Sequence, residues 1–401
     1  SNTDIQELKD EYEKLGALIK GLELILNDES KMKSLMKHEL KKVKEEYATP
    51  RKSEIRDEIV EVKIDTTKMI SKEDVIVVVT NEGYVKRVSV RSHEASDTET
   101  GLKDGDYVTF KAKMNTMDIL LLFTDLGNYL YIPVYEIPDL KWKDLGKHVS
   151  NLISIKANEN IIKSVPVYDF NDDIYITSFT KNGMVKRTKL SEFKAMRYSK
   201  PICSMKLKED DSVVDVTDCF GSKVLVVTNL GYALNFGIHE IPVTGLKASG
   251  VKSISLKDDF VVNGMIYSDD MEYLTVITDK STGKRIKLSE FDLMNRARRG
   301  VRIIRDIKTN PYHINASFII SYKESSLHKT GKDLLEYKLT ELPISDCHSA
   351  GSTMIKDPIL NVSIIPSLES KENVKKIEKE NINLNTIDEK MMTIDDFLKD
   401  L

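Results

Sequence analysis

The sequence has few cysteines, few prolines and no long hydrophobic run. Its 401 residues include three cysteines, ten prolines and one tryptophan. Cys203, Cys219 and Cys347 lack the spacing of metal ligands and form no even set, which suits a reducing compartment better than a disulfide framework. No apolar stretch approaches about eighteen residues and no secretion signal is present, so the sequence predicts a cytoplasmic protein without a membrane span.

Recognisable catalytic motifs are also missing. The chain contains no GxGxxG, P-loop or HExxH motif, and its seven histidines are scattered. Tyr198 follows Arg197, as a nucleophilic tyrosine beside an activating arginine would, but no general base or metal-binding acid cluster accompanies it. We therefore interpret Tyr198 as a loop aromatic, and we expect no catalytic residue, metal or cofactor in this chain.

What the sequence does contain is a repeat of strand, tight turn and strand. Six copies occur at intervals of about fifty residues, with first strands at 75–80, 119–124, 174–180, 224–228 and 274–278 and a weaker sixth copy turning at 330–331. Five turns are followed nine residues later by a glutamate, at Glu136, Glu192, Glu240, Glu290 and Glu341. A strand-built repeat of this length predicts a closed ring of blades, because one blade cannot bury both of its faces alone.

A second landmark predicts further strands in each blade. It recurs seventeen to twenty residues after the turns, at Gly101, Gly146, Pro201, Gly250, Gly300 and Gly351. Each is expected to precede another apolar strand, which gives blades of about four strands. The early segment 59–64 is a candidate to close the ring by pairing with the last blade. Trp142, the single tryptophan, is expected to be a packing anchor.

The two ends of the chain depart from the repeat. Residues 5–26 place apolar residues at alternating steps of three and four, which predicts a coiled-coil seam whose partner lies outside this chain, or an amphipathic helix lying on a core. Residues 27–30 should break this helix and cap a second one. Residues 367–401 hold six lysines against nine carboxylates and predict a disordered acidic tail. The expected domains are 1–54 (helical arm and linker), 55–366 (six-bladed ring) and 367–401 (tail).

Basic residues follow the repeat, although the net charge of the chain is −4. A Lys-Arg pair comes after the turn of alternate blades, at Lys86-Arg87, Lys186-Arg187 and Lys284-Arg285. The second and fourth blades carry Leu130-Tyr131 and Leu234-Asn235 at the same point. Segments 181–200 (seven basic residues, one acidic) and 284–305 (eight basic, two acidic) each have a net charge of +6. The signal for a nucleic-acid partner is therefore local.

Cations spaced around a curved rim suit the phosphates of bent duplex DNA. Each phosphate contact adds affinity through counterion release and carries no base information. Many contacts are needed, because bending the duplex costs on the order of several kcal/mol. The alternative is that these are solvated charges on edge strands that prevent aggregation. The return of the pair on alternate blades favours DNA binding.

Residues 80–87 and 228–232 resemble the blades of the C-terminal domain of bacterial type IIA topoisomerase A subunits. The heptad followed by residues 47–55 is similar to the end of that family's coiled-coil arm and the start of its linker. Helix, linker and blades come in the family's order over about residues 5–366. The resemblance implies a mainly β fold: a six-bladed β-pinwheel, a propeller-like ring that binds and bends DNA on its outer edge, preceded by an α-helical coiled-coil segment.

The loop of the first blade separates two branches of this family. Gyrase A subunits carry a basic Gln/Arg/Gly/Lys-rich box there, which wraps DNA. Residues 93–106 instead hold five carboxylates and one lysine, which would repel phosphate, and the partial echo of the box at 298–300 lies in the fifth blade. Residues 142–147 and 296–301 are similar to topoisomerase IV A subunits of Gram-positive bacteria. The resemblance thus favours the topoisomerase IV branch, with a gyrase A subunit with a degraded box as the alternative.

Membership in that branch implies a non-catalytic part of an ATP-dependent isomerase that passes one duplex through another, in decatenation, relaxation and chromosome segregation. The family's active-site tyrosine lies upstream of the coiled coil, so none is expected here, and ATP and Mg²⁺ would bind elsewhere in the whole enzyme. The implied partners are double-stranded DNA, a B subunit, and also a second A subunit, in the cytoplasm at the nucleoid. The expected phosphate contacts are Lys86, Arg87, Lys186, Arg187, Lys284, Arg285, Arg298, Arg299 and Arg302, with Arg91, Lys143 and Lys147 in addition.

A propeller used for protein–protein recognition is the alternative from a different functional class. It predicts salt-insensitive binding to a protein partner and indifference to DNA.

Overall fold

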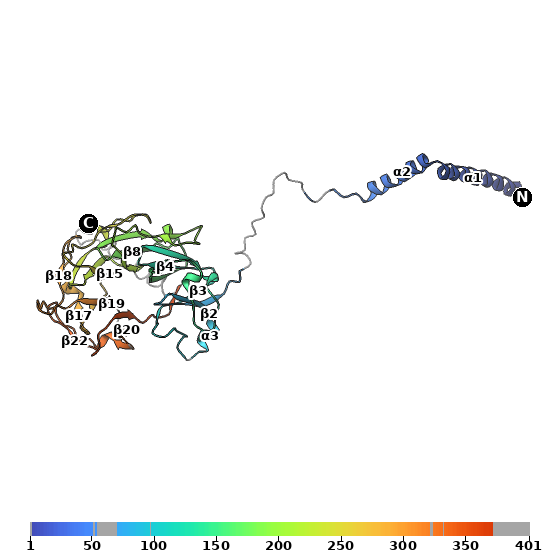
Figure 1. Ribbon diagram of the computed structural model, residues 1–401. Coiled ribbons are helices and arrows are strands. Elements are labelled where there is room, and N and C mark those ends of the chain that lie inside the picture. The colour runs from blue at the N-terminus through green and yellow to red at the C-terminus, as the bar shows by residue number, and fades with distance from the viewer. Residues whose placement is uncertain are drawn as a thin grey trace, which may run out of the picture. The chain divides into compact units, whose positions relative to one another are not determined.

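The computed structural model describes residues 2–50, 53, 70–96, 98–320, 324–331 and 333–371. The chain divides into two compact units, Ser1–Asp65 and Thr66–Leu401 (Figure 1). The expected domain boundary between residues 54 and 55 and the expected closing strand at 59–64 lie outside the described residues.

The N-terminal unit contains two helices, α1 (Asn2–Asn27) and α2 (Glu29–Tyr47). The expected break is confirmed at Asp28, whose carboxylate accepts a hydrogen bond from the Ser30 backbone N–H at 2.8 Å and caps α2. The seam residues of α1 between Ile5 and Leu26 are each more than half exposed. An exposed seam with heptad spacing fits a helix that pairs with another chain, so the coiled coil stays a prediction.

The C-terminal unit is a ring of six β-sheets, and the six-bladed pinwheel is confirmed (Figure 1). Each blade contains the hairpin that the repeat predicted. The hairpins are β1 (Asp74–Thr80) with β2 (Tyr84–Ser89), β4 (Ile119–Thr124) with β5 (Asn128–Pro133), β8 (Tyr175–Thr180) with β9 (Met184–Lys189), β12 (Lys223–Thr228) with β13 (Tyr232–Gly237), β16 (Tyr273–Thr278) with β17 (Thr282–Lys287), and β20 (Ser325–Lys329) with β21 (Leu334–Lys338). In the first five blades the first hairpin strand is buried along almost all of its length, which explains its continuous apolar sequence.

Threonine and glycine shape the hairpin turns. In the first five blades the hydroxyl of the threonine that ends the first strand accepts a hydrogen bond from the backbone N–H four residues later, at 3.1–3.3 Å. The residue before that N–H has a left-handed backbone, with φ +84° at Gly83 and +57° at Ser281. Glycine adopts this conformation without strain, which is why the Thr-x-x-Gly spacing recurs in four of these turns.

A third strand of each blade lies beside the first hairpin strand and faces the centre of the ring. These inner strands are β3 (Val108–Asn115), β7 (Ile161–Val167), β11 (Val213–Thr217), β15 (Val261–Tyr267), β19 (Ile314–Ile319) and β23 (Asn361–Ile364). Neighbouring inner strands contact one another from β3 to β23, which joins the blades in sequence order around the ring.

The first five blades are each completed by a short outer strand that the next blade donates. The outer strands are β6 (Lys147–His148), β10 (Ile202–Cys203), β14 (Val251–Lys252), β18 (Val301–Arg302) and β22 (Ser352–Thr353). Each directly follows one of the landmark residues, so that prediction is confirmed for five of the six landmarks. Each donated outer strand therefore forms hydrogen bonds between its own blade and the preceding blade.

Short helical turns connect the hairpins to the outer strands and contain the recurring glutamates. They are η2 (Val134–Glu136), η4 (Leu190–Phe193), η5 (Ile238–Glu240), η6 (Leu288–Glu290) and η7 (Leu339–Glu341). The first blade has α3 (Val90–Glu94) at this point, and a further turn, η3 (Val149–Asn151), follows β6.

The expectation of a strand after Gly101 is wrong. Such a strand would be the outer strand that blade 1 donates to blade 6. In the described part of the chain, the sixth sheet has three strands, in the order β21-β20-β23. The loop around Gly101 binds the second blade instead: the Trp142 indole Nε1 donates to the Thr98 carbonyl at 2.8 Å, and Gly101 N donates to the Trp142 carbonyl at 3.2 Å. Trp142 is 8% exposed, so its role as a packing anchor is confirmed.

The ring extends past the expected start of the tail at residue 367. Strand β24 (Glu369–Ser370) pairs in parallel with β3. Strand β3 is the inner strand of its blade. The backbone N–H and C=O groups on its side away from β1 are therefore open to another strand. Residues 372–401 lie outside the described residues.

Candidate nucleic-acid interface

The three lysines of the expected Lys-Arg pairs are buried. Lys86 and Lys186 are 2% exposed, and Lys284 is 1% exposed. Each is the third residue of the second hairpin strand, and its side chain extends beneath loops rather than into solvent. The structure therefore corrects the expectation that these three lysines contact phosphate.

Backbone carbonyl groups surround each buried ammonium. The accepting carbonyls belong to Trp142 (2.8 Å) and Asp144 (2.6 Å) for Lys86, to Ser204 and Leu246 for Lys186, and to Asp346 (2.7 Å), Cys347 (3.2 Å) and Ser349 (2.9 Å) for Lys284. An ammonium has three N–H donors, so Lys284 uses all of its own. Carbonyl dipoles that point at each ammonium group thus stabilise its charge in place of water.

Burial also changes the acidity of these groups. It lowers the pKa of Lys86, Lys186 and Lys284 from 10.5 to about 8, because desolvation penalises the charged form. The Asp144 carboxylate opposes this shift of the Lys86 pKa by attraction. All three lysines are still mostly protonated at neutral pH.

Except for Ser204, which directly follows one of them, the carbonyls come from segments that we name crossing loops: each runs from a helical turn to the end of the outer strand. They are residues 137–148 in blade 2, 194–203 in blade 3, 241–252 in blade 4, 291–302 in blade 5 and 342–353 in blade 6. Since the outer strand is the edge of its sheet, the crossing loops form the outer edge of the ring.

Exposed cations recur in four of these loops. They are Lys141, Lys143 and Lys147 in blade 2, Lys194, Arg197 and Lys200 in blade 3, Lys247 and Lys252 in blade 4, and Arg298 and Arg299 in blade 5. The crossing loop of blade 6 has neither lysine nor arginine. The expected contacts Lys143, Lys147, Arg298 and Arg299 therefore lie at the outer edge.

The arginines of the three pairs are half-buried where hairpin and crossing loop meet. Arg285 donates from Nε to the Leu342 carbonyl at 2.9 Å and from Nη2 to the Thr340 carbonyl at 3.0 Å. The Arg187 guanidinium lies 4.1 Å from the centre of the Tyr175 ring. The Arg87 side chain is 19% exposed. These contacts make the three arginines part of the joint between loop and hairpin.

Arginines from the crossing loop of the fifth blade lie against Tyr232 of the fourth blade. The Arg299 guanidinium lies 4.3 Å from the Tyr232 ring centre and donates to its hydroxyl at 3.0 Å. Arg302 is half-buried and pairs with Asp306 at 3.0 Å, so its charge is partly neutralised. Arg298 is exposed. Arg298 and Arg299 are thus better placed for a phosphate than Arg302.

The loop of the first blade presents negative charge beside one arginine. Arg91 and Glu94 are exposed on α3, while Glu99 and Asp104 are exposed in the loop that follows. The single lysine of that loop, Lys103, pairs with Glu82 at 2.7 Å. A phosphate group approaching Arg91 would meet these carboxylates.

Sequence reasoning missed several exposed cations. Lys194, Arg197 and Lys200 were part of a net-positive segment but were not among the expected contacts, and Lys247 and Lys252 were overlooked. Their signal is position: each lies between a recurring glutamate and the outer strand that follows the glycine or proline landmark. Proximity to the outer-strand landmark is thus a better guide to the edge than the Lys-Arg pair.

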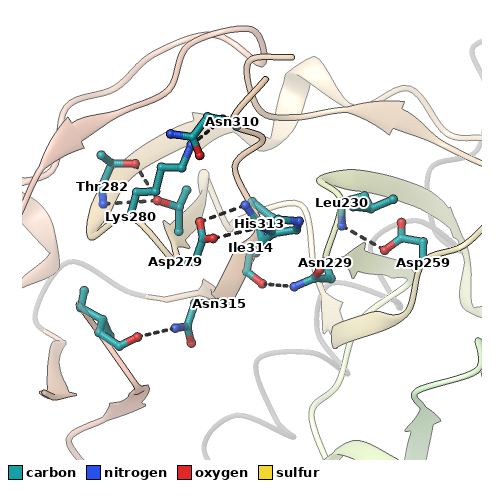
Figure 2. A network of polar contacts seen from close by, with 12 residues as sticks. Asn229, Leu230, Asp259, Asp279, Lys280, Thr282, Asn310, His313, Ile314 and Asn315 are labelled. Carbon is teal, nitrogen blue, oxygen red and sulfur yellow. Dashed lines mark hydrogen bonds and ion pairs between the residues drawn. The ribbon is translucent and has the colours of Figure 1, made fainter. Parts of the chain in front are cut away.

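Polar side chains also gather at the turn ends of the blades. A cavity of about 440 Å³ is lined there by Asn229, Asp279, His313 and Asn315 among others. Figure 2 shows these groups engaged with one another and with backbone: Asn229 Nδ2 donates to the Ile314 carbonyl at 3.2 Å, and His313 Nδ1 lies 3.1 Å from Asp279 Oδ2. They connect neighbouring segments of the ring, and among the described residues no group of three or more His, Cys, Asp or Glu could hold a metal ion.

The family can now be identified. A sequence profile described as DNA gyrase C-terminal domain, beta-propeller, matches residues 74–92, 118–167, 175–219, 222–267 and 272–321. The chain belongs to this family. Its match covers the first five blades, which are the ones that carry the regular hairpin turns.

Within the DNA gyrase C-terminal domain family, the chain is similar to topoisomerase IV A subunits. The A subunit of DNA topoisomerase 4 from Bacillus subtilis is 44% identical over 356 residues, which are 88% of this chain and 44% of that protein. The Staphylococcus epidermidis protein of the same name is 36% identical over 358 residues, 88% of this chain and 45% of that protein. The chain therefore spans less than half the length of these relatives. The expected resemblance to the topoisomerase IV branch of Gram-positive bacteria is confirmed.

Solved structures agree with this placement in the family. A crystal structure of the C-terminal domain of DNA topoisomerase IV has a TM-score of 0.70 at 40% identity, covering 74% of this chain and 94% of that one. A DNA gyrase A C-terminal domain has a TM-score of 0.55 at 23% identity, covering 73% of this chain and all of that one, and shows a shared fold. Among the described residues no helix is long and apolar enough to cross a membrane.

Proposed function

We propose that this chain is the DNA-binding C-terminal domain of a topoisomerase IV A subunit, and that duplex DNA bends along the crossing loops of blades 2 to 5. The chain contributes phosphate contacts and no catalytic group. Its part in the reaction is to hold a bent duplex that the rest of the enzyme uses in strand passage.

The observation that carries this proposal is the row of exposed cations in four consecutive crossing loops. Each of these loops places two or three lysines or arginines on the outer edge of the ring. The phosphates of a duplex repeat at short intervals, so cations on a curved edge can contact them in succession only if the DNA bends towards the ring. Phosphate contacts do not read bases, so we expect little sequence preference.

The negative part of the edge limits the DNA path. The crossing loop of blade 6 contains Asp346 and no lysine or arginine, and residues 93–106 of blade 1 contain five carboxylates. The exposed ones, Glu94, Glu99, Asp104 and Asp346, would repel phosphates, so the favourable path runs between blade 2 and blade 5. We therefore propose a partial bend and not the complete wrap of a gyrase domain.

The remainder of the proposal concerns the whole enzyme. The exposed α1 seam would pair with another helix of the same polypeptide or of its dimer partner. A B subunit would supply ATP turnover, magnesium would act at the cleavage site, and both lie outside this chain. The whole enzyme would relax and decatenate DNA during chromosome segregation, in the cytoplasm at the nucleoid.

Charge reversal on the edge tests DNA binding. The variant carries Arg197→Glu, Lys200→Glu, Arg298→Glu and Arg299→Glu, all at exposed positions. Its affinity for a long linear duplex should fall by about 100-fold or more at ~0.1 M salt, and the slope of log affinity against log salt should become shallower by about three. A donor–acceptor pair on the DNA ends would report the bend as a shortened distance.

The matched control reverses four exposed lysines outside the ring, with Lys9→Glu, Lys20→Glu, Lys31→Glu and Lys37→Glu on the two helices. This control has the same net charge as the edge variant and should bind nearly as well as the unmodified chain. Equal losses in both variants would mean that only net charge matters. If the unmodified chain fails to bind DNA at low salt, the ring is better explained as a protein-recognition module.

A further inference from the structure

The buried lysines are attached to different kinds of loop. The two carbonyls that bind Lys86 belong to Trp142 and Asp144, which flank the exposed Lys143. One carbonyl that binds Lys186 belongs to Leu246, directly before the exposed Lys247. The carbonyls that bind Lys284 lie in the crossing loop of blade 6, which has no lysine or arginine.

We propose that the buried ammonium groups of Lys86 and Lys186 position the exposed lysines that contact DNA. Each fixes the backbone beside one cation of the outer edge, Lys143 or Lys247, and so sets where that cation meets a phosphate. Lys86 and Lys186 are positioning residues that never touch DNA themselves. This inference rests on the proposed DNA-binding function.

The geometry explains why the loops depend on these lysines. Two carbonyl oxygens that point at one place repel each other and are unsatisfied unless a donor stands between them. For the blade 2 loop that donor is the Lys86 ammonium, which also lies 5.6 Å from the centre of the Trp142 ring. Without the ammonium, the Trp142 carbonyl would keep the Thr100 hydroxyl (3.0 Å) and Gly101 N (3.2 Å) as donors, but the Asp144 carbonyl would lose the Lys86 donor, and the backbone between Trp142 and Asp144 would relax.

Lys186 connects the crossing loop of blade 4 with the residue that directly follows the crossing loop of blade 3. Its second acceptor is the carbonyl of Ser204, the residue after the crossing loop of blade 3, which carries the exposed Arg197 and Lys200. We therefore expect a larger effect on DNA binding at Lys186 than at Lys86. Lys284 is the internal control, because it makes the same kind of contact with a loop that has no cation to position.

The first experiment measures DNA affinity of the full chain after Lys86→Met, Lys186→Met and Lys284→Met. Lys86→Met and Lys186→Met should each weaken binding about tenfold or more at ~0.1 M salt, since misplacing one cation loses about one phosphate contact. Lys284→Met should stay within about twofold of the unmodified chain, because no phosphate contact is lost. Equal losses in all three variants would overturn the proposal, because they would reflect a general loss of structure.

A double-mutant cycle separates positioning from direct contact. If Lys86 acts through Lys143, then Lys86→Met should cost little in a chain that already carries Lys143→Gln. Additive losses would mean that Lys86 acts independently of Lys143 and would overturn the proposal. Lys86→Arg sharpens the distinction: a residue that contacts phosphate tolerates arginine, whereas the carbonyl cage does not fit the larger guanidinium.

A readout without DNA tests the loop itself. Under native conditions, trypsin should cleave the Lys86→Met variant after Lys143 about tenfold faster than it cleaves the unmodified chain, because the loop opens more readily. An unchanged cleavage rate would overturn the proposal, whether or not the chain binds DNA. Conversely, faster cleavage in a chain that does not bind DNA would fault the proposed function and leave the anchoring of the loop intact.

If a methionine variant fails to fold, leucine provides a second variant, because Leu130 and Leu234 occupy the equivalent buried place in other blades. The cycle of Lys186→Leu with Lys247→Gln then tests the same claim at the second loop. Additivity in that cycle would overturn the proposal.

Discussion

The third residue of the second hairpin strand is a lysine in blades 1, 3 and 5 and a leucine in blades 2 and 4. Leu130 and Leu234 are fully buried among apolar residues of their own and the preceding blade. Lys86, Lys186 and Lys284 are buried almost as completely, but among backbone carbonyls. The ring therefore determines that the position is buried, and the loop above it determines whether an apolar or a charged residue fits.

The same alternation joins the blades in pairs. Backbone bridges connect Arg87 with Asp139, Arg187 with Val243 and Arg285 with Ile344, and so join each odd blade to the crossing loop of the following even blade. In odd blades an aromatic residue at the start of the crossing loop is inserted instead: Phe193, directly before the loop of blade 3, and Phe291, the first residue of the loop of blade 5, are buried in the core between blades. These features thus repeat every two blades, as do the nearly identical octapeptides at 186–193 and 284–291, which lie 98 residues apart.

The largest expected effect comes from placing a lysine where the even blades have a leucine. Leu234→Lys would place an ammonium among the apolar residues around Phe179 and Phe236, where it has no carbonyl cage. We expect a loss of about 3–5 kcal/mol in the free energy of unfolding, the range for an uncompensated buried charge, measured by urea denaturation. Leu234→Met is the control and should cost less than about 1.5 kcal/mol. A neutral result for Leu234→Lys would show that the even blades tolerate a charge.

A second test concerns how closely a crossing loop approaches the hairpin. Gly250 has φ +76°, and a Cβ there would lie 2.3 Å from the Val185 carbonyl oxygen, next to Lys186. Gly250→Ala should therefore lower the free energy of unfolding by about 2–4 kcal/mol. Gly245, in the same loop, has open space around its Cβ position, so Gly245→Ala is the matched control and should be nearly neutral. Similar costs at both sites would argue against close packing at Gly250.

The third prediction concerns alkaline pH. The pKa of Lys186 is about 8 in the folded chain and 10.5 ordinarily, so between these values the unfolded state binds more protons. The contribution of Lys186 to stability should rise by about 1–3 kcal/mol as the pH increases from 8 to 10.5. Urea denaturation of the unmodified chain and of Lys186→Leu at each pH measures it, since leucine removes the titrating group. Parallel pH profiles would contradict the lowered pKa.

The smallest expected effect concerns the acidic part of the edge. Glu94 and Glu99 are exposed beside Arg91 in the first blade. Glu94→Lys with Glu99→Lys should raise DNA affinity by only about three- to tenfold and steepen the salt slope by about one, because the added cations lie beyond the proposed path. A much larger gain would mean that DNA already passes this loop.

Much of the fold was predictable because its signals are local. Apolar runs such as 75–79, the Thr-x-x-Gly turns and the landmark residues before the outer strands depend on neighbours a few residues away. The missing outer strand after Gly101 was not predictable, because its loop is held by Trp142, about forty residues later in the chain. Strand β24 escaped prediction for a similar reason, since it exists only where β3 offers a free edge.

The candidate site was predicted less well than the fold. The presence of Leu130 and Leu234 at the position of the lysines was the available sign that this position is buried, but a Lys-Arg pair beside a turn is also typical of an exposed edge. Lys143, Lys147, Arg298 and Arg299 are exposed in crossing loops, so their contact with DNA stays a prediction, while Lys247 and Lys252 carried no distinctive pattern of their own.

The sequence by itself determined the number of blades, the hairpin of each blade and the family, because periodic apolar strands and turn residues act over short distances. Only the tertiary structure decided which cations face solvent. Lys86 meets the Trp142 carbonyl 56 residues further along the chain, and Lys186 meets the Leu246 carbonyl 60 residues further along. Burial of a charge is set by such distant contacts, because it is stable only where other parts of the chain supply the dipoles that replace water.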